Sequence, residues 1–139
     1  MQTRTEADTM SAGDALGREL RAGDVVLLYG DLGAGKTAFV RGIARGLGVD
    51  ADEVSSPTFT IVQEYAGAGP TLFHVDLYRL EPAEVEDLGL EDLVAGNGVV
   101  AIEWAERWQQ RPDDVYQVRL TAADDDTRTI QISEPPDHR

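Results

Sequence analysis

The residues best suited to chemistry lie at positions 30–37, which read Gly-Asp-Leu-Gly-Ala-Gly-Lys-Thr and match the phosphate-binding pattern G-x-x-x-x-G-K-[ST]. Glycines let such a loop turn successive backbone N–H groups toward phosphate oxygens. Lys36 adds a positive charge that can reach the β and γ phosphates, and the Thr37 hydroxyl can ligate Mg²⁺. A glycine-rich turn that only joins two elements has no need of Lys-Thr, so the pattern predicts binding of a nucleoside triphosphate.

The segments on both sides of this loop have the character that a phosphate site needs. The apolar run at residues 25–29 predicts a buried parallel strand, and the composition of residues 38–47 predicts a helix. Bound phosphates would then lie at the N-terminus of that helix, where the backbone carries a partial positive charge.

Two carboxylates end apolar runs elsewhere in the chain. Glu103 follows residues 99–102 and Asp76 follows residues 72–75, and ligands of open α/β sheets bind beyond the carboxyl ends of the strands. Glu103 could ligate Mg²⁺ or orient water, or it could be an exposed residue after a strand. Asp76 could face the same metal, or it could cap the turn that follows its strand.

Three further signals are weaker. Residues 55–58 read Ser-Ser-Pro-Thr and could sense a γ phosphate through a hydroxyl, or they could form an ordinary loop with a proline-set bend. Trp104 could pack on a substrate, although a tryptophan beside a buried strand more often belongs to the core. His74 alternates with Asp76 on one face of its strand, and we do not expect it to be a ligand.

The composition restricts the class of protein. The chain has 139 residues, enough for one domain that spans residues 1–139. It has no cysteine, which excludes disulfides, thiol catalysis and cysteine-ligated zinc. No apolar run approaches the ~20 residues of a membrane span and no signal peptide opens the chain, so we expect a cytoplasmic protein without a membrane partner.

The net charge of −14 comes from 26 acidic and 12 basic residues. Nucleic-acid-binding modules usually show a basic face, so this balance argues against one. The acidity could serve a basic protein partner, or it could be an ordinary soluble surface.

The remaining pattern predicts an α/β fold of the P-loop NTPase type, with a parallel core sheet extended by antiparallel strands and flanked by helices. We expect a helix from Asp8 or Thr9 to about residue 21, and a helix that begins at Pro82, contains Val85 and Leu88 and could extend to Leu90 and Leu93. Beyond the buried strands, the expected strands are a short edge strand at residues 3–5, a hairpin of residues 59–65 and 71–76, and two alternating strands at residues 116–121 and 128–133.

Four blocks, taken in order, resemble the TsaE family of small bacterial ATPases, once called YjeE. The blocks are Gly-Asp-Leu-Gly-Ala-Gly-Lys-Thr at residues 30–37, Ser-Pro-Thr-Phe-Thr at 56–60, His-Val-Asp-Leu-Tyr-Arg-Leu at 74–80 and Ile-Glu-Trp at 102–104, with Leu-Gly-Leu at 88–90 before the last. The resemblance covers about residues 9–104. The loop alone is generic, but the set of blocks is specific.

The resemblance also implies roles for single residues. It assigns phosphate and Mg²⁺ binding to the loop and the helix start: Asp31, Leu32, Gly33, Ala34, Gly35, Lys36, Thr37 and Ala38. Glu103 matches the Mg²⁺-site glutamate, Asp76 and Trp104 match other active-site positions, and Thr58 lies in a switch-like segment. Thr9 falls where the family has a nucleotide-contacting threonine, and Arg128 is expected near the base.

By this resemblance the protein is an ATPase that uses ATP and Mg²⁺ to support threonylcarbamoylation of adenosine 37 in tRNA. TsaB and TsaD are its implied partners, and they, rather than this acidic chain, would hold the tRNA. Two other functions remain open: a small-molecule kinase, against which the lack of an arginine-rich lid weighs, and a nucleotide-gated switch with negligible hydrolysis.

Overall fold

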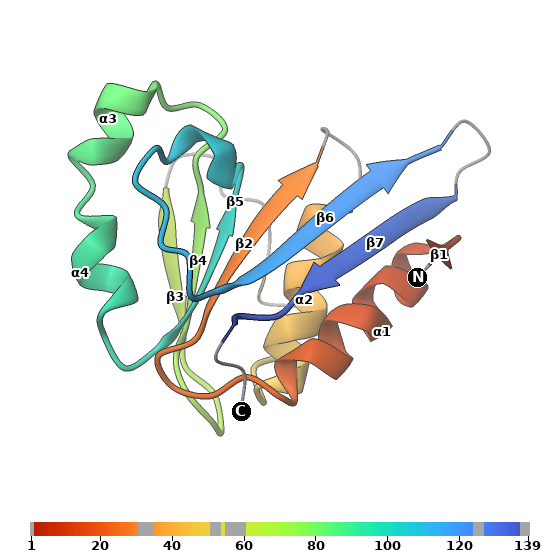
Figure 1. Cartoon of the computed structure of the whole chain (residues 1–139). Coiled ribbons are helices and arrows are strands. Elements are labelled where there is room, and N and C mark those ends of the chain that lie inside the picture. Colours follow the sequence, from red (N-terminus) through yellow and green to blue (C-terminus); the bar gives the residue numbers. More distant parts are fainter. Residues whose placement is uncertain (1, 31–34, 51–53, 55–60, 124–126, 137–139) are drawn as a thin grey trace.

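The computed structural model describes residues 2–30, 35–50, 54, 61–123 and 127–136. Figure 1 shows how their helices and strands are arranged. In chain order these are β1 (Gln2–Thr3), α1 (Glu6–Gly17), β2 (Val25–Gly30), α2 (Lys36–Gly46), β3 (Val62–Tyr65), β4 (Leu72–Asp76), α3 (Pro82–Glu86), α4 (Leu90–Val94), β5 (Val99–Glu103), the 3₁₀ helix η2 (Ala105–Arg107), β6 (Tyr116–Ala122) and β7 (Arg128–Ser133).

All the described strands form one seven-stranded sheet in the order β1-β7-β6-β2-β5-β4-β3. The four central strands, β6, β2, β5 and β4, run parallel to one another. The outer pairs are antiparallel: β3 with β4 on one side, and β7 with β6 and β1 on the other. This confirms the predicted α/β fold, a parallel core with antiparallel extensions, and it shows that β6 belongs to the parallel core.

Strand β2 is buried on both faces, which explains why its sequence is continuously apolar rather than alternating. Val26 and Leu28 pack with α1 and α2 in one core, whereas Leu27 and Tyr29 pack with α3, α4 and the segment after β5 in a second core. In Figure 1, α1 and α2 run together along one part of the sheet, and α3 and α4 lie at its other end.

Helices α1 and α2 approach each other at glycines. A Cβ added to any of four glycines would lie 2.0–2.5 Å from a backbone oxygen of the facing helix, closer than real Cβ atoms come. These residues are Gly13 and Gly17 on α1, and Gly42 and Gly46 on α2. The spacing of four residues puts both glycines of each helix on one side, so the two backbones meet there without intervening side chains.

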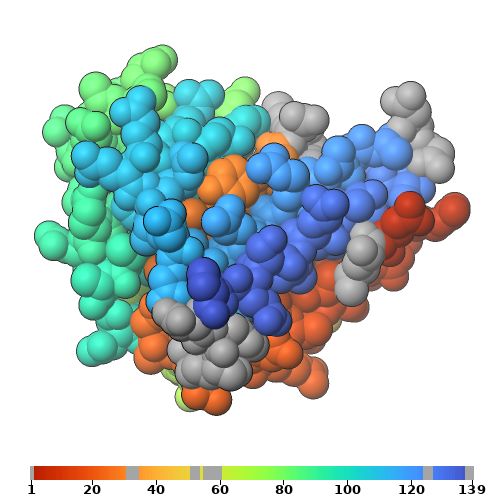
Figure 2. Space-filling model, in the orientation of Figure 1, coloured from red at the N-terminus to blue at the C-terminus, as the bar shows by residue number. Residues whose placement is uncertain are grey.

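On the face of the sheet opposite α1 and α2, no helix of the described residues covers β6 and β7. Figure 2 shows side chains of β6 and β7 at the surface on this side of the molecule. Gln117, Arg119 and Gln131 are exposed there, and the Arg119 guanidinium lies 5.1 Å from the centre of the Tyr29 ring. None of the helices in the described part of the chain is long and apolar enough to cross a membrane.

Two predicted helices differ from the observed ones. Helix α1 begins earlier than expected, because the Thr5 hydroxyl rather than Asp8 or Thr9 caps it by accepting a hydrogen bond from the Asp8 N–H. The helix expected from Pro82 is two five-residue helices, because Gly89 adopts a left-handed conformation with φ 73° and starts α4 in a new direction.

Candidate functional site

The carboxyl ends of three parallel strands bring the candidate residues together. Gly30 ends β2, Asp76 ends β4 and Glu103 ends β5, which lies between the other two strands. Glu103 pairs in register with Leu28 on one side and Asp76 on the other. Helix α2 begins at Lys36 immediately after the phosphate-binding loop, so its N-terminus faces the same edge.

Thr37 and Glu103 are in contact at this edge. The Thr37 hydroxyl donates to the Glu103 carboxylate, with Oγ1 3.4 Å from Oε1 and 3.3 Å from Oε2. Two oxygens in adjacent octahedral positions around Mg²⁺ are about 3 Å apart, because each lies about 2.1 Å from the ion. The pair therefore fits the spacing that a shared Mg²⁺ requires after a small adjustment.

The donor set has the composition expected for a cation that also binds phosphate. Among the described residues, no group of three or more His, Asp or Glu side chains could hold a metal ion. Mg²⁺ in phosphate-binding sites usually takes only one or two protein ligands and completes its shell with phosphate oxygens and water. One hydroxyl and one carboxylate match this number of protein ligands.

Glu103 also contacts a side chain of the neighbouring strand β4. It is only 3% exposed, and its Oε2 lies 2.5 Å from Nε2 of His74, which is fully buried. His74 was not expected to take part in the site. The signal that could have revealed it is its position on β4, two residues before Asp76 and on the face that Glu103 shares.

Asp76 lies beside Glu103 but is engaged differently. Its Oδ1 accepts a hydrogen bond of 2.9 Å from the Tyr78 backbone N–H, so one oxygen is already used by the turn. Burial raises the pKa of Asp76 above its usual range, the Tyr78 N–H opposes that rise, and the Glu103 carboxylate adds to it. Both the turn-capping role and a place at the site edge apply to this residue.

Lys36 and Trp104 meet at the mouth of the loop. The Lys36 ammonium donates to the Gly30 carbonyl oxygen at 2.5 Å and lies 4.2 Å from the centre of the Trp104 ring. Trp104 has a left-handed backbone with φ 58°, which is uncommon for a residue with a side chain. Its ring also packs on Tyr78, with centroids 4.9 Å apart. The tryptophan is therefore in contact with the predicted phosphate-binding lysine.

Thr9, which is predicted to contact the nucleotide, lies near Gly35, and the nucleotide contact itself stays a prediction. It is buried on α1, and its hydroxyl is 2.9 Å from the Thr3 hydroxyl. A Cβ added to Gly35 would lie 3.4 Å from the Thr9 methyl group, so α1 passes close to the last glycine of the loop. Gly35 itself has φ 98°, a conformation that favours glycine.

The other predicted site residues divide into two groups. Ala38 is buried in the first turn of α2, and Arg128 begins β7 opposite Thr3, which holds Thr9. The role of Arg128 near a base stays a prediction. Five residues, Asp31, Leu32, Gly33, Ala34 and Thr58, lie outside the described part of the chain.

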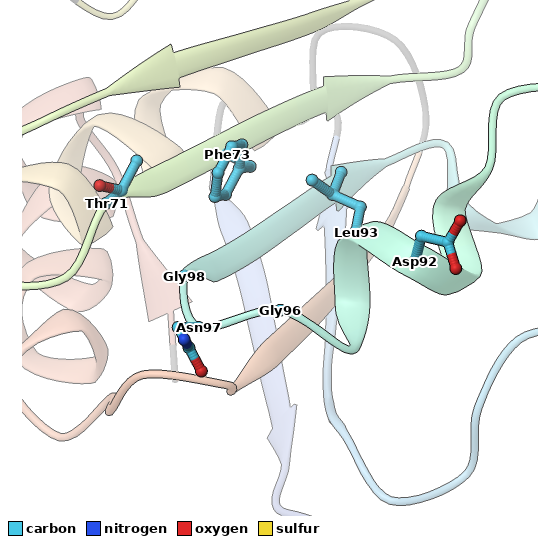
Figure 3. A pocket seen from close by; sticks show the side chains of 7 residues that line it. All are labelled: Thr71, Phe73, Asp92, Leu93, Gly96, Asn97 and Gly98. Atoms are coloured by element: carbon cyan, nitrogen blue, oxygen red, sulfur yellow. The ribbon is translucent and has the colours of Figure 1, made fainter.

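A separate hollow lies at the opposite edge of the sheet, where β4 and β5 begin. Figure 3 shows it between β4 and the loop that joins α4 to β5, with a volume of about 300 Å³. Phe73 and Leu93 supply its apolar side chains, and Asp92 supplies its one charged side chain. Among the described residues, neither Lys36 and Thr37 nor Glu103 lines it, so it is separate from the Thr37–Glu103 pair.

The parallel sheet, the loop between β2 and α2, and the paired Thr37 and Glu103 together define a phosphate-loop NTPase fold. A family sequence model described as "Threonylcarbamoyl adenosine biosynthesis protein TsaE" matches residues 3–130. The chain belongs to the TsaE family of tRNA threonylcarbamoyladenosine biosynthesis proteins.

Individual relatives agree with this assignment. The TsaE protein of Nostoc sp. strain PCC 7120 is 46% identical over 129 residues, which cover 90% of this chain and 79% of the relative. The TsaE protein of Treponema pallidum is 42% identical over 133 residues and is covered to 97%, with 94% of this chain. The crystal structure of Bacillus subtilis YdiB superposes with a TM-score of 0.79 at 34% identity, covering 97% of this chain and 84% of that one.

Proposed function

We propose that this chain binds ATP with Mg²⁺ and hydrolyses it in support of the threonylcarbamoyladenosine modification of tRNA. The observation that carries the proposal is the Thr37–Glu103 pair, 3.3–3.4 Å apart and directly beside the start of α2. A hydroxyl from the loop and a carboxylate from a neighbouring strand are the two protein ligands that phosphoryl transfer on this fold requires.

The residues divide the work of binding. Loop N–H groups and the N-terminus of α2 attract the phosphates, and the Lys36 ammonium leaves the Gly30 carbonyl for the β and γ oxygens. Thr37 and Glu103 hold Mg²⁺, which when bound neutralises charge that develops on the phosphate oxygens. Asp76 lies one strand further out, where its free oxygen can orient water.

The ligand assignment favours Glu103 over Asp76 for direct contact with the metal. Glu103 is within hydrogen-bonding distance of Thr37, whereas Asp76 accepts its hydrogen bond from the Tyr78 backbone. Because Trp104 contacts Lys36, its fluorescence should change when a nucleotide binds.

The partner proposal rests on family membership and charge. We assign TsaB and TsaD as the proteins with which this chain acts, and they bind the tRNA in its place. A net charge of −14 disfavours strong contact between this chain and the RNA phosphates, and it suits docking on basic surfaces of protein partners.

The test measures nucleotide binding and turnover with matched variants. Calorimetry should show Mg²⁺-ATP binding to the wild type and an affinity at least about tenfold weaker for Lys36→Ala, because a charge-assisted contact is lost. Glu103→Gln should lower turnover on the order of 100-fold, since the bound metal supplies several kcal/mol of stabilisation. Glu106→Gln, an exposed glutamate three residues later, is the matched control and should leave both unchanged.

Each outcome separates the proposed function from its alternatives. Normal affinity in Lys36→Ala would contradict the phosphate-binding role of the loop. Turnover should rise when TsaB and TsaD are added, and multiple-turnover modification of tRNA should depend on this chain. Phosphorylation of a small molecule would identify a kinase instead, and binding without turnover in every condition would identify a switch.

A further inference from the structure

His74 is a buried polar residue on β4, and one of its two ring nitrogens has no hydrogen-bond partner in the described part of the chain that would offset its burial. The side chain is fully buried, and Nδ1 has no hydrogen-bond partner among the described residues. A buried polar atom without a partner destabilises the folded state, and an apolar side chain at the same place would avoid that cost. A reason for a histidine must therefore come from its other nitrogen.

The other nitrogen, Nε2, lies 2.5 Å from Oε2 of Glu103. A carboxylate can only accept hydrogen bonds, so Nε2 carries the hydrogen of this contact. This contact comes from β4, which lies on the side of β5 away from β2 and the loop. The hydrogen bond fixes Oε2 of Glu103 and so restricts rotation of the Glu103 carboxylate.

Glu103 thus stands between two groups with different roles. On one side is the His74 ring, which contacts Oε2 alone, and on the other is the Thr37 hydroxyl, which lies 3.4 Å from Oε1 and 3.3 Å from Oε2. The rigid strand β4 carries the first group, and the first turn of α2 carries the second. Residues that hold a metal ligand by a hydrogen bond fix its orientation and raise its effectiveness.

We propose that His74 is a positioning residue: its Nε2–H holds Oε2 of Glu103, so that Oε1 is directed toward the cation shared with Thr37. This inference rests on the proposed function, because it concerns the same cation. It goes further in assigning a role to a residue that does not itself touch the nucleotide or the metal.

The test compares substitutions that keep or remove the donor. His74→Gln can place an amide N–H near the position of Nε2, whereas His74→Leu fills the space without a donor, and His74→Asn is too short to reach Glu103. The concentration of Mg²⁺ that gives half-maximal ATP turnover should rise 10–100-fold in His74→Leu and His74→Asn, and by much less in His74→Gln. If the leucine variant does not fold, the test still stands on the half-maximal Mg²⁺ concentrations of His74→Asn and His74→Gln, which should differ.

A second measurement separates positioning from general damage to the fold. ATP binding in EDTA depends on the loop and Lys36 but not on the cation, so every folded His74 variant should keep its metal-free affinity. Val75→Ala is the matched control, since Val75 is the next residue, fully buried, and faces the opposite core. It should lower stability without changing the Mg²⁺ requirement.

The possible failures are distinguishable. If the wild type requires Mg²⁺ for turnover but His74→Leu and His74→Asn have the same requirement, the positioning role is wrong and the proposed function stands. If His74 variants lose metal-free affinity in parallel with turnover, the role is merely structural and the inference is also wrong. If the wild type binds no ATP at all, the proposed function fails and the inference fails with it.

Discussion

The two faces of the sheet are packed in opposite ways. On one face, α1 and α2 meet backbone to backbone, and an added Cβ on Gly42 would lie 2.0 Å from the carbonyl oxygen of Met10. On the other face, α3 and α4 are five residues long, and a Cβ on Gly89 would meet nothing within 4 Å. The α1–α2 contact therefore has no space for another atom, whereas the backbone between α3 and α4 has open space at Gly89. We call the face with α1 and α2 the tight face and the face with α3 and α4 the looser face.

The tight face is also the one that carries the candidate chemistry. Helix α2 presents Thr37 to Glu103, and helix α1 presents Thr9 to Gly35 of the loop. Close packing of the two helices therefore fixes Gly35 and the start of α2 relative to the sheet. The looser face contributes Trp104 and the residues after it. None of them is a predicted phosphate ligand, but the Trp104 ring contacts Lys36, which is one.

The largest effect should come from Gly42→Ala. The new methyl group would collide with the backbone of α1 and force the helices apart, which should lower the free energy of unfolding by about 3 kcal/mol or more. Because α1 also passes close to the loop at Thr9, any folded protein should bind ATP more weakly. Urea denaturation and calorimetry would measure the two changes.

Gly89→Ala is the matched change on the looser face. It places a methyl group in open space, so its cost is the left-handed backbone conformation alone, about 1 kcal/mol. ATP affinity should not change. Equal losses of stability in Gly42→Ala and Gly89→Ala would contradict the difference in packing between the two faces.

A smaller effect should come from Asp14, which joins the two helices electrostatically. Asp14 on α1 is 9% exposed and accepts from Arg45 of α2 at 2.7 Å and from Arg18 at 2.9 Å. The hydrogen bond from Arg45 lowers the pKa of Asp14 most, burial opposes it, and Arg18 lowers it further. Asp14→Asn should reduce the free energy of unfolding at pH 7 by about 1 kcal/mol.

The dependence of this effect on pH follows from the lowered pKa. The folded state holds the Asp14 proton more weakly than the unfolded state, so the stabilisation is present above the ordinary value of 3.8 and is lost as the pH falls through the lower folded value. Glu6→Gln is the control, because Glu6 also pairs with α2 through Arg41 but is 66% exposed. Its loss should stay within about 0.5 kcal/mol and disappear in salt. A loss in Glu6→Gln as large as that in Asp14→Asn would argue against the special role of the buried carboxylate.

The elements around the loop could be predicted from the sequence because their signals are local. An apolar run before Gly30 and another before Glu103 predict strands that end at the same edge, and the parallel register of β2 with β5 confirms this. The hairpin of β3 and β4 follows from the glycine-proline turn at residues 66–70. Each of these sequence signals lies within a short stretch of the chain, even where the strands that it predicts pair over a long distance.

The features that the sequence does not predict depend mainly on residues that are far apart in the chain. Glycines such as Gly13 and Gly42 read as weak helix residues, and their use as a contact surface appears only when the helices are brought together. The role of His74 is hidden for the same reason, because its partner Glu103 is 29 residues away. The division between α3 and α4 was missed because the leucines at helical spacing continue across Gly89, whose backbone conformation ends the pattern.

The smallest effect on stability should come from Asp76→Asn, and it should have the opposite sign. Burial raises the pKa of Asp76, so the folded state holds this proton more tightly than the unfolded state, and ionisation at neutral pH costs stability. Asparagine removes the charge and can still accept from the Tyr78 N–H. The variant should be more stable than the wild type at pH 7, by less than about 1 kcal/mol because solvent screens this partly exposed group. The gain should shrink as the pH falls toward 3.8, the ordinary value for aspartate.

The same substitution should reduce ATP turnover, because an amide orients water less effectively than a carboxylate does. Gains in stability at the cost of activity are characteristic of residues kept for function. Asp92→Asn, on exposed helix α4 of the looser face, should change neither quantity and is the matched control. Urea denaturation at pH 7 and at a lower pH, with turnover measured on the same samples, would test both parts. If Asp76→Asn were less stable at pH 7 and fully active, Asp76 would be a turn-capping residue and nothing more, and the site would consist of the groups that α2 and β5 supply.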